Sequence, residues 1–231
     1  MTVMSFVRTP HQLKLTHHPK AHDSPGRPFG LNSTPMLDGY HDVPRGKIAA
    51  VVTYLEMRTP PPINRTRAPS SEFPVRHVAH PDLDRYRELY RRIGEPWLWF
   101  SRLRMSDDEL RRILHDPAVD IFALSHAGTD HGLLEFDRRS FPEIELSFFG
   151  VTPGLVGKGA GHALLQHCLP LAWEHQPKRV WLHTCTFDHP AALTFYRKAG
   201  FQPYKRAIEI ADDPRTTGDL PRTSAPHIPI L

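Results

Sequence analysis

The sequence has few cysteines and no long apolar run. Two cysteines, Cys168 and Cys185, occur in 231 residues, too few for the disulfide framework of a small secreted domain. No apolar run approaches the ~18 residues of a membrane-spanning helix, and no signal-peptide pattern is visible. We therefore expect a protein of the reducing cytoplasm that acts without a membrane.

Strong charge of one sign is also lacking. The formal net charge is +4 and the pI is about 9.2, a balance that suits an anionic ligand but is too diffuse to predict nucleic-acid binding. Two nucleotide-binding motifs are absent as well. Gly157-Lys158 is followed by Gly159 instead of the Ser or Thr of a P-loop, and the third glycine, Gly161, comes too early for a dinucleotide fingerprint.

Composition divides the chain into one domain and two tails. Residues 1–46 are rich in His, Pro, Gly and Ser and lack periodicity, which predicts a mostly disordered tail. Residues 47–210 have the apolar patterning of a single domain, and residues 211–231 are a polar, proline-containing tail. The histidines of the first tail lack the cysteine and carboxylate spacing of a metal site, so we predict no bound metal.

The stretch from Glu143 to Gly161 has the clearest pattern. Apolar and polar residues alternate at its start, as in a half-buried strand, until Phe148, Phe149 and Gly150 break the alternation. That break predicts a β-bulge or a splayed strand. Three glycines between residues 157 and 161 then precede a helix, which predicts a turn that either binds phosphate through its N–H groups or needs glycine for steric reasons alone.

Two blocks of this region resemble a known family. Val151-Thr152-Pro153 precedes Gly159-Ala160-Gly161, and Ala192 through Phe201 follows with Tyr196, Lys198 and Gly200 in fixed positions. In this order and spacing the blocks resemble the GCN5-related N-acetyltransferase (GNAT) family, most densely over residues 143–205 and over roughly 47–210 in all.

The resemblance implies an α/β fold with a splayed, mixed central sheet flanked by helices, and acetyl-CoA as cosubstrate. The pantetheine arm would pair with the strand that ends at Val151, the pyrophosphate would lie on the glycine turn, and the Tyr196 hydroxyl would protonate the departing thiolate. The chain has Val156 where the family usually has Gln or Arg, and His189 where it often has Asn. The implied acetyl-CoA residues are Phe149, Val151, Val156, Gly157, Lys158, Gly159, Ala160, Gly161, His189 and Tyr196.

The remaining elements are predicted from periodicity and from helix and turn signals. Ser106 and Glu109 have the spacing of a capping box, and Ala127 to Asp130 have the composition of a hairpin turn. The expected strands are 48–57, 75–78, 120–125, 133–137, 180–184 and 205–210. The expected helices are 83–94, 106–114, one that follows the glycine turn and carries an apolar stripe from Leu164 to Ala172, and 192–199.

Amine acetylation also requires a base, because the attacking nitrogen must lose a proton. The carboxylates Glu143, Glu145 and Glu135 are candidates, with Glu145 preferred because it lies nearest the predicted splay; an exposed strand face is the alternative. Glu95, Trp97 and Trp99, in the segment GEPWLWF, are candidates for receiving a cationic amine by charge and cation–π contact. Packing of both tryptophans on the sheet is the alternative.

The leading hypothesis is an acetyl-CoA-dependent N-acetyltransferase in which a primary amine attacks the thioester directly. A non-catalytic acyl-CoA-binding sensor or regulatory module is the alternative. The acceptor, a small molecule or a protein lysine, is left open because acceptor specificity is set by loops without a transferable code. A monomer and a homodimer both fit the sequence.

Overall fold

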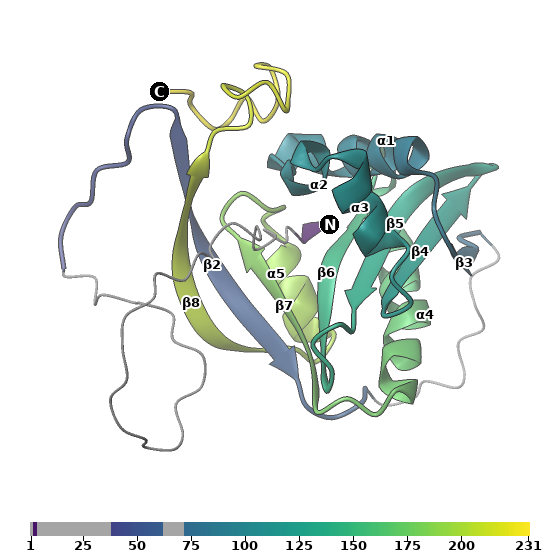
Figure 1. Ribbon diagram of the computed structural model, residues 1–231. Coiled ribbons are helices and arrows are strands. Elements are labelled where there is room, and N and C mark those ends of the chain that lie inside the picture. Colours follow the sequence, from purple (N-terminus) through teal and green to yellow (C-terminus); the bar gives the residue numbers. More distant parts are fainter. Residues whose placement is uncertain (1, 4–37, 62–71) are drawn as a thin grey trace, which may run out of the picture.

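A computed structural model describes residues 2–3, 38–61 and 72–231. They form one mixed sheet in the order β3-β4-β5-β6-β7-β2-β8, and β1 pairs with β6 outside this path (Figure 1). The strands are β1 (Thr2–Val3), β2 (Lys47–Met57), β3 (Val75–His77), β4 (Val119–His126), β5 (Thr129–Asp137), β6 (Glu143–Val151), β7 (Arg179–Cys185) and β8 (Gln202–Asp212). The helices are α1 (Leu83–Gly94), α2 (Ser101–Arg104), α3 (Asp107–Leu114), α4 (Ala160–Glu174) and α5 (Ala192–Lys198), with short 3-10 turns η2 (Glu95–Trp97) and η3 (Pro153–Leu155).

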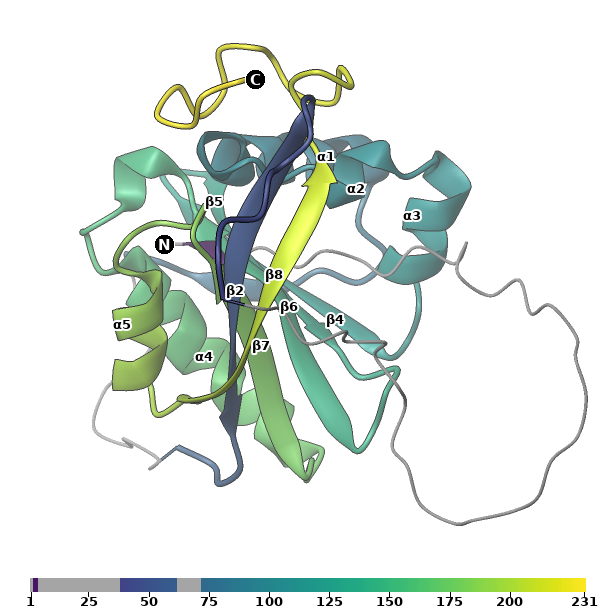
Figure 2. The same cartoon turned by 90° about the vertical axis from the view of Figure 1, so that its left-hand side faces the viewer.

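Helices cover the sheet on both faces (Figure 2). On the face that we call the back face, α4 and α5 pack through Leu165 and Tyr196 against strand residues such as Phe149. On the opposite, front face, α1 and α3 pack through side chains such as Tyr90 against strand residues that include Phe148. The predicted mixed α/β fold with a helix-flanked sheet is confirmed.

The predicted order of the central strands is also confirmed. β4 and β5 form a hairpin whose turn residues, Ala127 and Gly128, have φ of 48° and 79°, the left-handed conformation of a tight hairpin turn. β5 pairs antiparallel with β6, and β6 pairs parallel with β7 through the α4 crossover. These connections form the antiparallel meander and the βαβ unit that the sequence predicted.

The bulge in β6 lies one residue earlier than predicted. Phe136 pairs with Leu146 and Glu135 with Phe148, so Ser147 is the extra residue. A bulge shifts the side-chain alternation by one residue. As a result, Leu146 before the bulge and Phe149 after it are both buried on the back face, while Phe148 is buried on the front.

The predicted helix starts and stripes agree with the structure. Ser106 and Glu109 form the reciprocal hydrogen bonds of a capping box at the start of α3, and α1 ends at Gly94 as expected. α4 includes Pro170 within its span. Its predicted apolar stripe is buried on the back face: Leu164, Leu165, Cys168, Leu169 and Ala172. The short helix α2 and the turn η2 were not predicted, because neither is long enough to show a period.

The domain extends past the predicted boundary at residue 210. β8 continues to Asp212, and Leu220 and Ala225 pack against Ile48 in a small cluster of buried residues. Arg215 is buried in this segment, where its guanidinium donates to Asp213 at 2.7 Å and to the Ile228 carbonyl at 2.7 Å. The predicted C-terminal tail is therefore packed on the domain.

The predicted N-terminal tail lies outside the described residues at positions 4–37, as does the middle of the predicted loop 58–74 at positions 62–71. Thr2 and Val3 are described, and they form a strand that the sequence analysis did not predict. Among the described residues, no helix is long and apolar enough to cross a membrane.

Candidate functional site

The glycine turn between β6 and α4 is open to an approaching ligand. Gly157 and Gly159 have φ of 80° and 87°, values that L side chains rarely adopt. A Cβ built on either residue would meet nothing within 4 Å, whereas one on Gly161 would lie 3.6 Å from the Phe149 ring. Gly157 and Gly159 are therefore glycines for backbone reasons, and both leave free space above the backbone.

Free N–H groups are concentrated at the start of α4. Gly159 is the N-cap and supplies no side-chain cap, so the first N–H groups of α4 have no partner in the helix. The N–H groups of Val156 and Lys158 donate to the carbonyls of Pro153 and Leu155, both at 3.2 Å. The donor set for an anion is thus narrower than predicted, and it faces the positive end of a 15-residue helix.

Tyr196 lies on α5 where β6 and β7 separate. Its side chain is fully buried, and its ring packs edge-on to Phe149 at 6.0 Å between centroids. Its hydroxyl forms no hydrogen bond with any residue that the structure describes. Burial, with a smaller contribution from Asp188, raises the pKa of Tyr196 well above its ordinary value, so the hydroxyl keeps a proton that it can donate. A buried donor without a partner is the feature expected of a group that meets a ligand atom.

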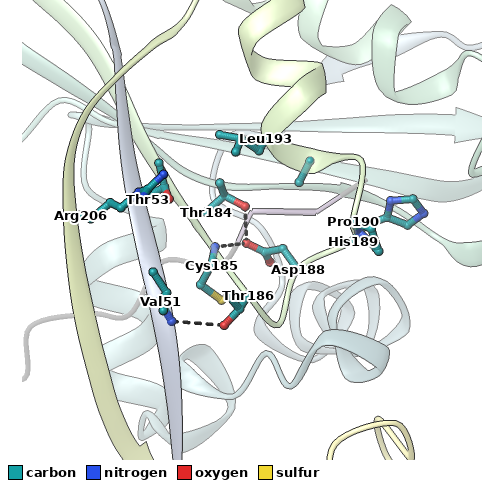
Figure 3. A pocket seen from close by; sticks show the side chains of 11 residues that line it. Val51, Thr53, Thr184, Cys185, Thr186, Asp188, His189, Pro190, Leu193 and Arg206 are labelled. Atoms are coloured by element: carbon teal, nitrogen blue, oxygen red, sulfur yellow. Dashed lines mark hydrogen bonds between the residues drawn. The ribbon is translucent and has the colours of Figure 1, made fainter. Parts of the chain in front are cut away.

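Asp188 fixes the start of α5 to the end of β7. Its carboxylate accepts the Thr184 hydroxyl at 2.6 Å and the Cys185 N–H at 2.8 Å (Figure 3). These residues line a pocket of about 350 Å³ on the back face, between β2, β8 and the start of α5. Neither Tyr196 nor the glycine turn lines this pocket. Asp188 therefore contributes by holding the loop that positions α5, a role with no signal in the sequence.

β6 and β7 separate after their last pair, toward the C-terminal end of each strand. Their parallel pairing covers only three positions, from Glu143 with Arg179 to Glu145 with Trp181. Farther along β6, Phe149 and Gly150 pair instead with Val3 and Thr2 of β1. Figure 1 shows β1 (purple) between the upper ends of β6 and β7. The predicted splay is present, and the edge of β6 within it accepts an extended chain.

His189 lies beside this opening, in the loop before α5. Its Nδ1 accepts the Ala191 N–H at 3.1 Å, an arrangement that places the ring proton on Nε2. Burial lowers the pKa of His189, which favours the neutral ring. Its ring packs against Trp97 at 5.3 Å between centroids, and Trp97 also packs against His227 of the C-terminal segment. Trp97 is half-buried and packs against the front-face cluster, as the packing alternative expected, and its contact with an acceptor stays a prediction.

The other two predicted acceptor residues are occupied elsewhere. Trp99 is fully buried between Tyr90 and Phe148, so the packing alternative is right for this residue and the substrate-contact prediction is wrong. Glu95 accepts a hydrogen bond from the Ser224 hydroxyl at 2.9 Å. Its carboxylate therefore anchors the C-terminal segment, which the sequence analysis had treated as a tail.

The candidate base Glu135 belongs to a closed network. It is fully buried on the front face, accepts the Tyr86 hydroxyl at 2.7 Å and forms an ion pair with the buried Arg102. A carboxylate held this way cannot accept a further proton without breaking the pair. Glu135 is a structural residue, and the sequence offered no sign of its partner.

The two other candidate bases lie on β6, in the part of the strand that precedes the bulge at Ser147. Glu143 is at the end of β6 farthest from the glycine turn and accepts a hydrogen bond from Arg179 at 2.8 Å. Glu145 is partly buried at the last β6–β7 pair, directly below the opening. Glu145 is therefore the nearer of the two to the opening, and a role as base stays a prediction for both.

Two titratable side chains of β7 face the front. Burial lowers the pKa of His183 to about 4 and raises the pKa of Cys185, so both are neutral at pH 7. His183 packs against Tyr54 at 5.4 Å between centroids. Neither side chain is a base at neutral pH.

Comparison with known proteins agrees with this geometry. Residues 83–201, just over half of the 231-residue chain, match the model of the acetyltransferase (GNAT) family. Curated relatives in Mycobacterium bovis and Mycobacterium tuberculosis, each an uncharacterized N-acetyltransferase, are 31% identical over 103 residues, which is 45% of this chain. The chain spans 65% of the length of these relatives.

Solved structures show the same fold. A GCN5-related N-acetyltransferase from Sphaerobacter thermophilus superimposes with a TM-score of 0.50 at 16% identity, over 74% of this chain and 53% of that one. An acetyltransferase of the GNAT family from Novosphingobium aromaticivorans gives 0.51 at 15% identity, over 73% and 67%. At these identities the likeness concerns the fold alone.

Proposed function

Because the chain belongs to the acetyltransferase (GNAT) family, we propose that it transfers the acetyl group of acetyl-CoA to a primary amine by direct attack. The observation that supports this proposal best is the Tyr196 hydroxyl, a buried donor without a described partner at the point where β6 and β7 part. It is the acid that the departing thiolate requires, and its raised pKa keeps the proton available.

Two parts of acetyl-CoA, the pyrophosphate and the pantetheine arm, match features of the opening. The pyrophosphate would lie at the start of α4, where N–H groups are free, no Cβ intrudes and the helix dipole favours an anion. Lys158 and Ala160 belong to this turn, and Val156 is held beside it. The arm would follow the edge of β6 between Val151 and Phe149 toward Tyr196.

The pairing of β1 with β6 supports a pantetheine arm that lies along the edge of β6. It also means that β1 and the arm compete for this edge. An extended chain already uses the edge of β6 at Phe149 and Gly150, so the opening is wide enough for a pantetheine arm with its two amide groups. The same backbone groups cannot pair with both chains. Acetyl-CoA binding therefore requires β1 to leave the edge of β6.

Calorimetric titration with acetyl-CoA tests the proposed function. We expect binding near micromolar for the native chain and no measurable binding for Gly159→Glu, which places a side chain and a negative charge in the turn. Gly218→Glu is the matched control, since Gly218 also has φ of 87° and open space around it and lies in the C-terminal segment. No binding to the native chain would contradict the proposal; equal loss in both variants would indicate a general effect on folding.

A non-catalytic acyl-CoA sensor is the second candidate, and the strand that already occupies the edge of β6 favours it. Such a protein would bind acetyl-CoA, release β1 and show no thiol release with any amine. Thiol release measured with an amine panel separates the two candidates. The acceptor class, small amine or protein lysine, is read from the same panel.

Two unbridged cysteines suit a reducing cytoplasm, which we propose as the compartment.

A further inference from the structure

We propose that Glu209 of β8 is the carboxylate that receives the acceptor amine and takes its proton. This inference rests on the proposed function and names a residue for a step that the function requires. The base candidates predicted from the sequence, Glu143, Glu145 and Glu135, are on β6 and β5. Glu209 is on β8, the strand at the opposite edge of the sheet from β3, and its side chain points to the front face.

Glu209 points to the front face. β8 pairs antiparallel with β2, where Glu209 lies opposite Ala50. Side chains two apart on a strand share a face, and Ala211 packs with the front-face cluster of buried residues. Arg206, on the other parity, lines the back-face pocket. The Glu209 carboxylate is therefore on the face that α1 to α3 cover, opposite the face that carries Tyr196.

Its surroundings on that face are apolar and uncharged. The neighbours by register and alternation are Ile48, Ala50, Val52, Ala207 and Ala211, and the three alanines leave room beside the carboxylate. Cys185 of β7 points to the same face, with β2 between it and β8, and the Glu209 charge is the last of the contributions that raise the pKa of the thiol. Cys185 is the last residue of β7, beyond the last β6–β7 pair. Glu209 is thus on the same face as the end of β7 that borders the splay, two strands away from it.

Glu209 also differs from several other sheet carboxylates in having no partner among the described residues. Glu135 is paired with Arg102, Glu143 with Arg179, and Glu56 with both Arg58 and Arg179. In residues 38–61 and 72–231, Glu209 forms no hydrogen bond or ion pair. A half-buried carboxylate without a partner is unfavourable unless a cation meets it there. An ammonium group of an acceptor is such a cation.

Burial raises the pKa of Glu209 to about 7, and no neighbouring charge contributes to the shift. The nearby titratable groups are the Cys185 thiol of β7, Tyr54 of β2, and Lys205 of β8, whose ammonium lies over the Tyr54 ring. Arg104 of α2, near the end of β8, is paired with Asp219. At neutral pH a carboxylate in this environment can both bind an ammonium group and accept a proton from it.

The proposed step balances in atoms and charge. Glu209 accepts one proton from the ammonium group, and the free nitrogen forms a bond to the thioester carbonyl carbon. The carbon–sulfur bond then breaks, and the thiolate takes the Tyr196 hydroxyl proton. The second proton of the nitrogen restores Tyr196, and Glu209 releases its proton to water. The products are the amide, CoA thiol and one proton.

A direct test measures the pKa of the Glu209 carboxyl group by carbon NMR. The signal of this carboxyl is assigned because it is absent in Glu209→Gln. The probes are propylamine, spermidine and a peptide with a free N-terminal amine, with propanol as the uncharged control. We expect at least one amine to lower the pKa of Glu209, while propanol leaves it unchanged. An unchanged pKa with all three amines would overturn the proposal, even if acetyl-CoA binds as proposed.

Kinetics with any amine that is acetylated give the second test. Glu209→Gln should lose about a hundredfold in kcat/KM, lose the lower limb of the pH profile near 7, and bind acetyl-CoA as tightly as the native chain. Glu209→Asp should recover part of the rate. Asp212→Asn is the matched control, because it removes one carboxylate from the same strand where it is exposed and paired with Lys47. Native kinetics in Glu209→Gln would assign the proton transfer to another group and leave the acetyl transfer itself in place.

Discussion

The back and front faces of the sheet differ in how far apart in the sequence their buried polar groups and ligand-binding groups lie. On the back face, the glycine turn, the start of α4 and Tyr196 come from residues 157–196 and are linked through one βαβ unit. On the front face, Tyr86, Arg102, Glu135 and Glu209 come from four separate elements and span more than half of the chain. A ligand bound by backbone groups at a helix start needs only local sequence, whereas a side-chain site needs the whole fold.

Two buried tyrosines, one on each face, differ in the hydrogen bonding of their hydroxyl groups. The Tyr86 hydroxyl donates to Glu135 at 2.7 Å on the front face. The Tyr196 hydroxyl on the back face has no partner in the described chain. Both side chains are almost fully buried, so burial alone does not separate a structural hydroxyl from one that meets a substrate. The partner separates them.

The largest expected effect is on stability and concerns the front face. Arg102→Met leaves the Glu135 carboxylate buried without its cation, and we expect a loss of about 3–5 kcal/mol in the free energy of unfolding, measured by denaturant titration. The double variant Arg102→Met with Glu135→Leu removes both charges and should recover most of that loss. A single variant as stable as the native chain would show that solvent reaches Glu135.

The two tyrosines sharpen the comparison. Tyr196→Phe should lower kcat about a hundredfold, or about 2.7 kcal/mol in activation free energy, without lowering the melting temperature, because its hydroxyl has no described partner to lose. Tyr86→Phe should do the reverse. It removes a donor to a buried carboxylate, which costs about 1–3 kcal/mol in stability, and it should leave kcat near the native value. Equal thermal destabilisation in the two variants would contradict the assignment.

The back face was also the more predictable from sequence. The glycine turn, the buried stripe of α4 and the position of Tyr196 follow from local periodicity and turn chemistry, which the sequence shows directly. The bulge was placed one residue late because two adjacent phenylalanines show that alternation slips without showing where; the register with β5 puts the extra residue at Ser147.

The front face could not be predicted in the same way. Nothing near Glu135 in the sequence points to Arg102, since the two meet only when α2 packs over β5. The C-terminal segment looked like a tail because its composition is polar, although one buried arginine, Arg215, organises it through carbonyls that no pattern marks. Glu209 reads as an ordinary polar position in a strand, and only the register with Ala50 and the proximity of Cys185 give it a place.

The next prediction concerns β1, the short strand that pairs with the edge of β6. Replacing Thr2 and Val3 together by proline removes the N–H groups with which β1 can pair with β6. We expect acetyl-CoA to bind severalfold more tightly in calorimetry, because the fraction of molecules with a free β6 edge rises. Replacing both residues by alanine keeps the backbone groups and is the control. Tighter binding in the alanine variant as well, or no change with proline, would contradict competition between β1 and the pantetheine arm.

The smallest expected effect is a pH-dependent stability difference at Glu209. Its pKa is raised from 4.5 to about 7 in the folded chain, so folding favours the protonated form, and the charged carboxylate destabilises the fold as pH rises through 7. Glu209→Gln removes this effect. Its gain over the native chain should be absent below about pH 4.5 and greatest above pH 7. We expect a gain of at most about 1 kcal/mol, because the group is partly exposed to solvent. Thermal melts of both chains across this pH range measure the gap, with Asp212→Asn as the control. A gap that stays constant with pH would mean that Glu209 already has a partner, and would remove the main physical reason for an ammonium group to bind there.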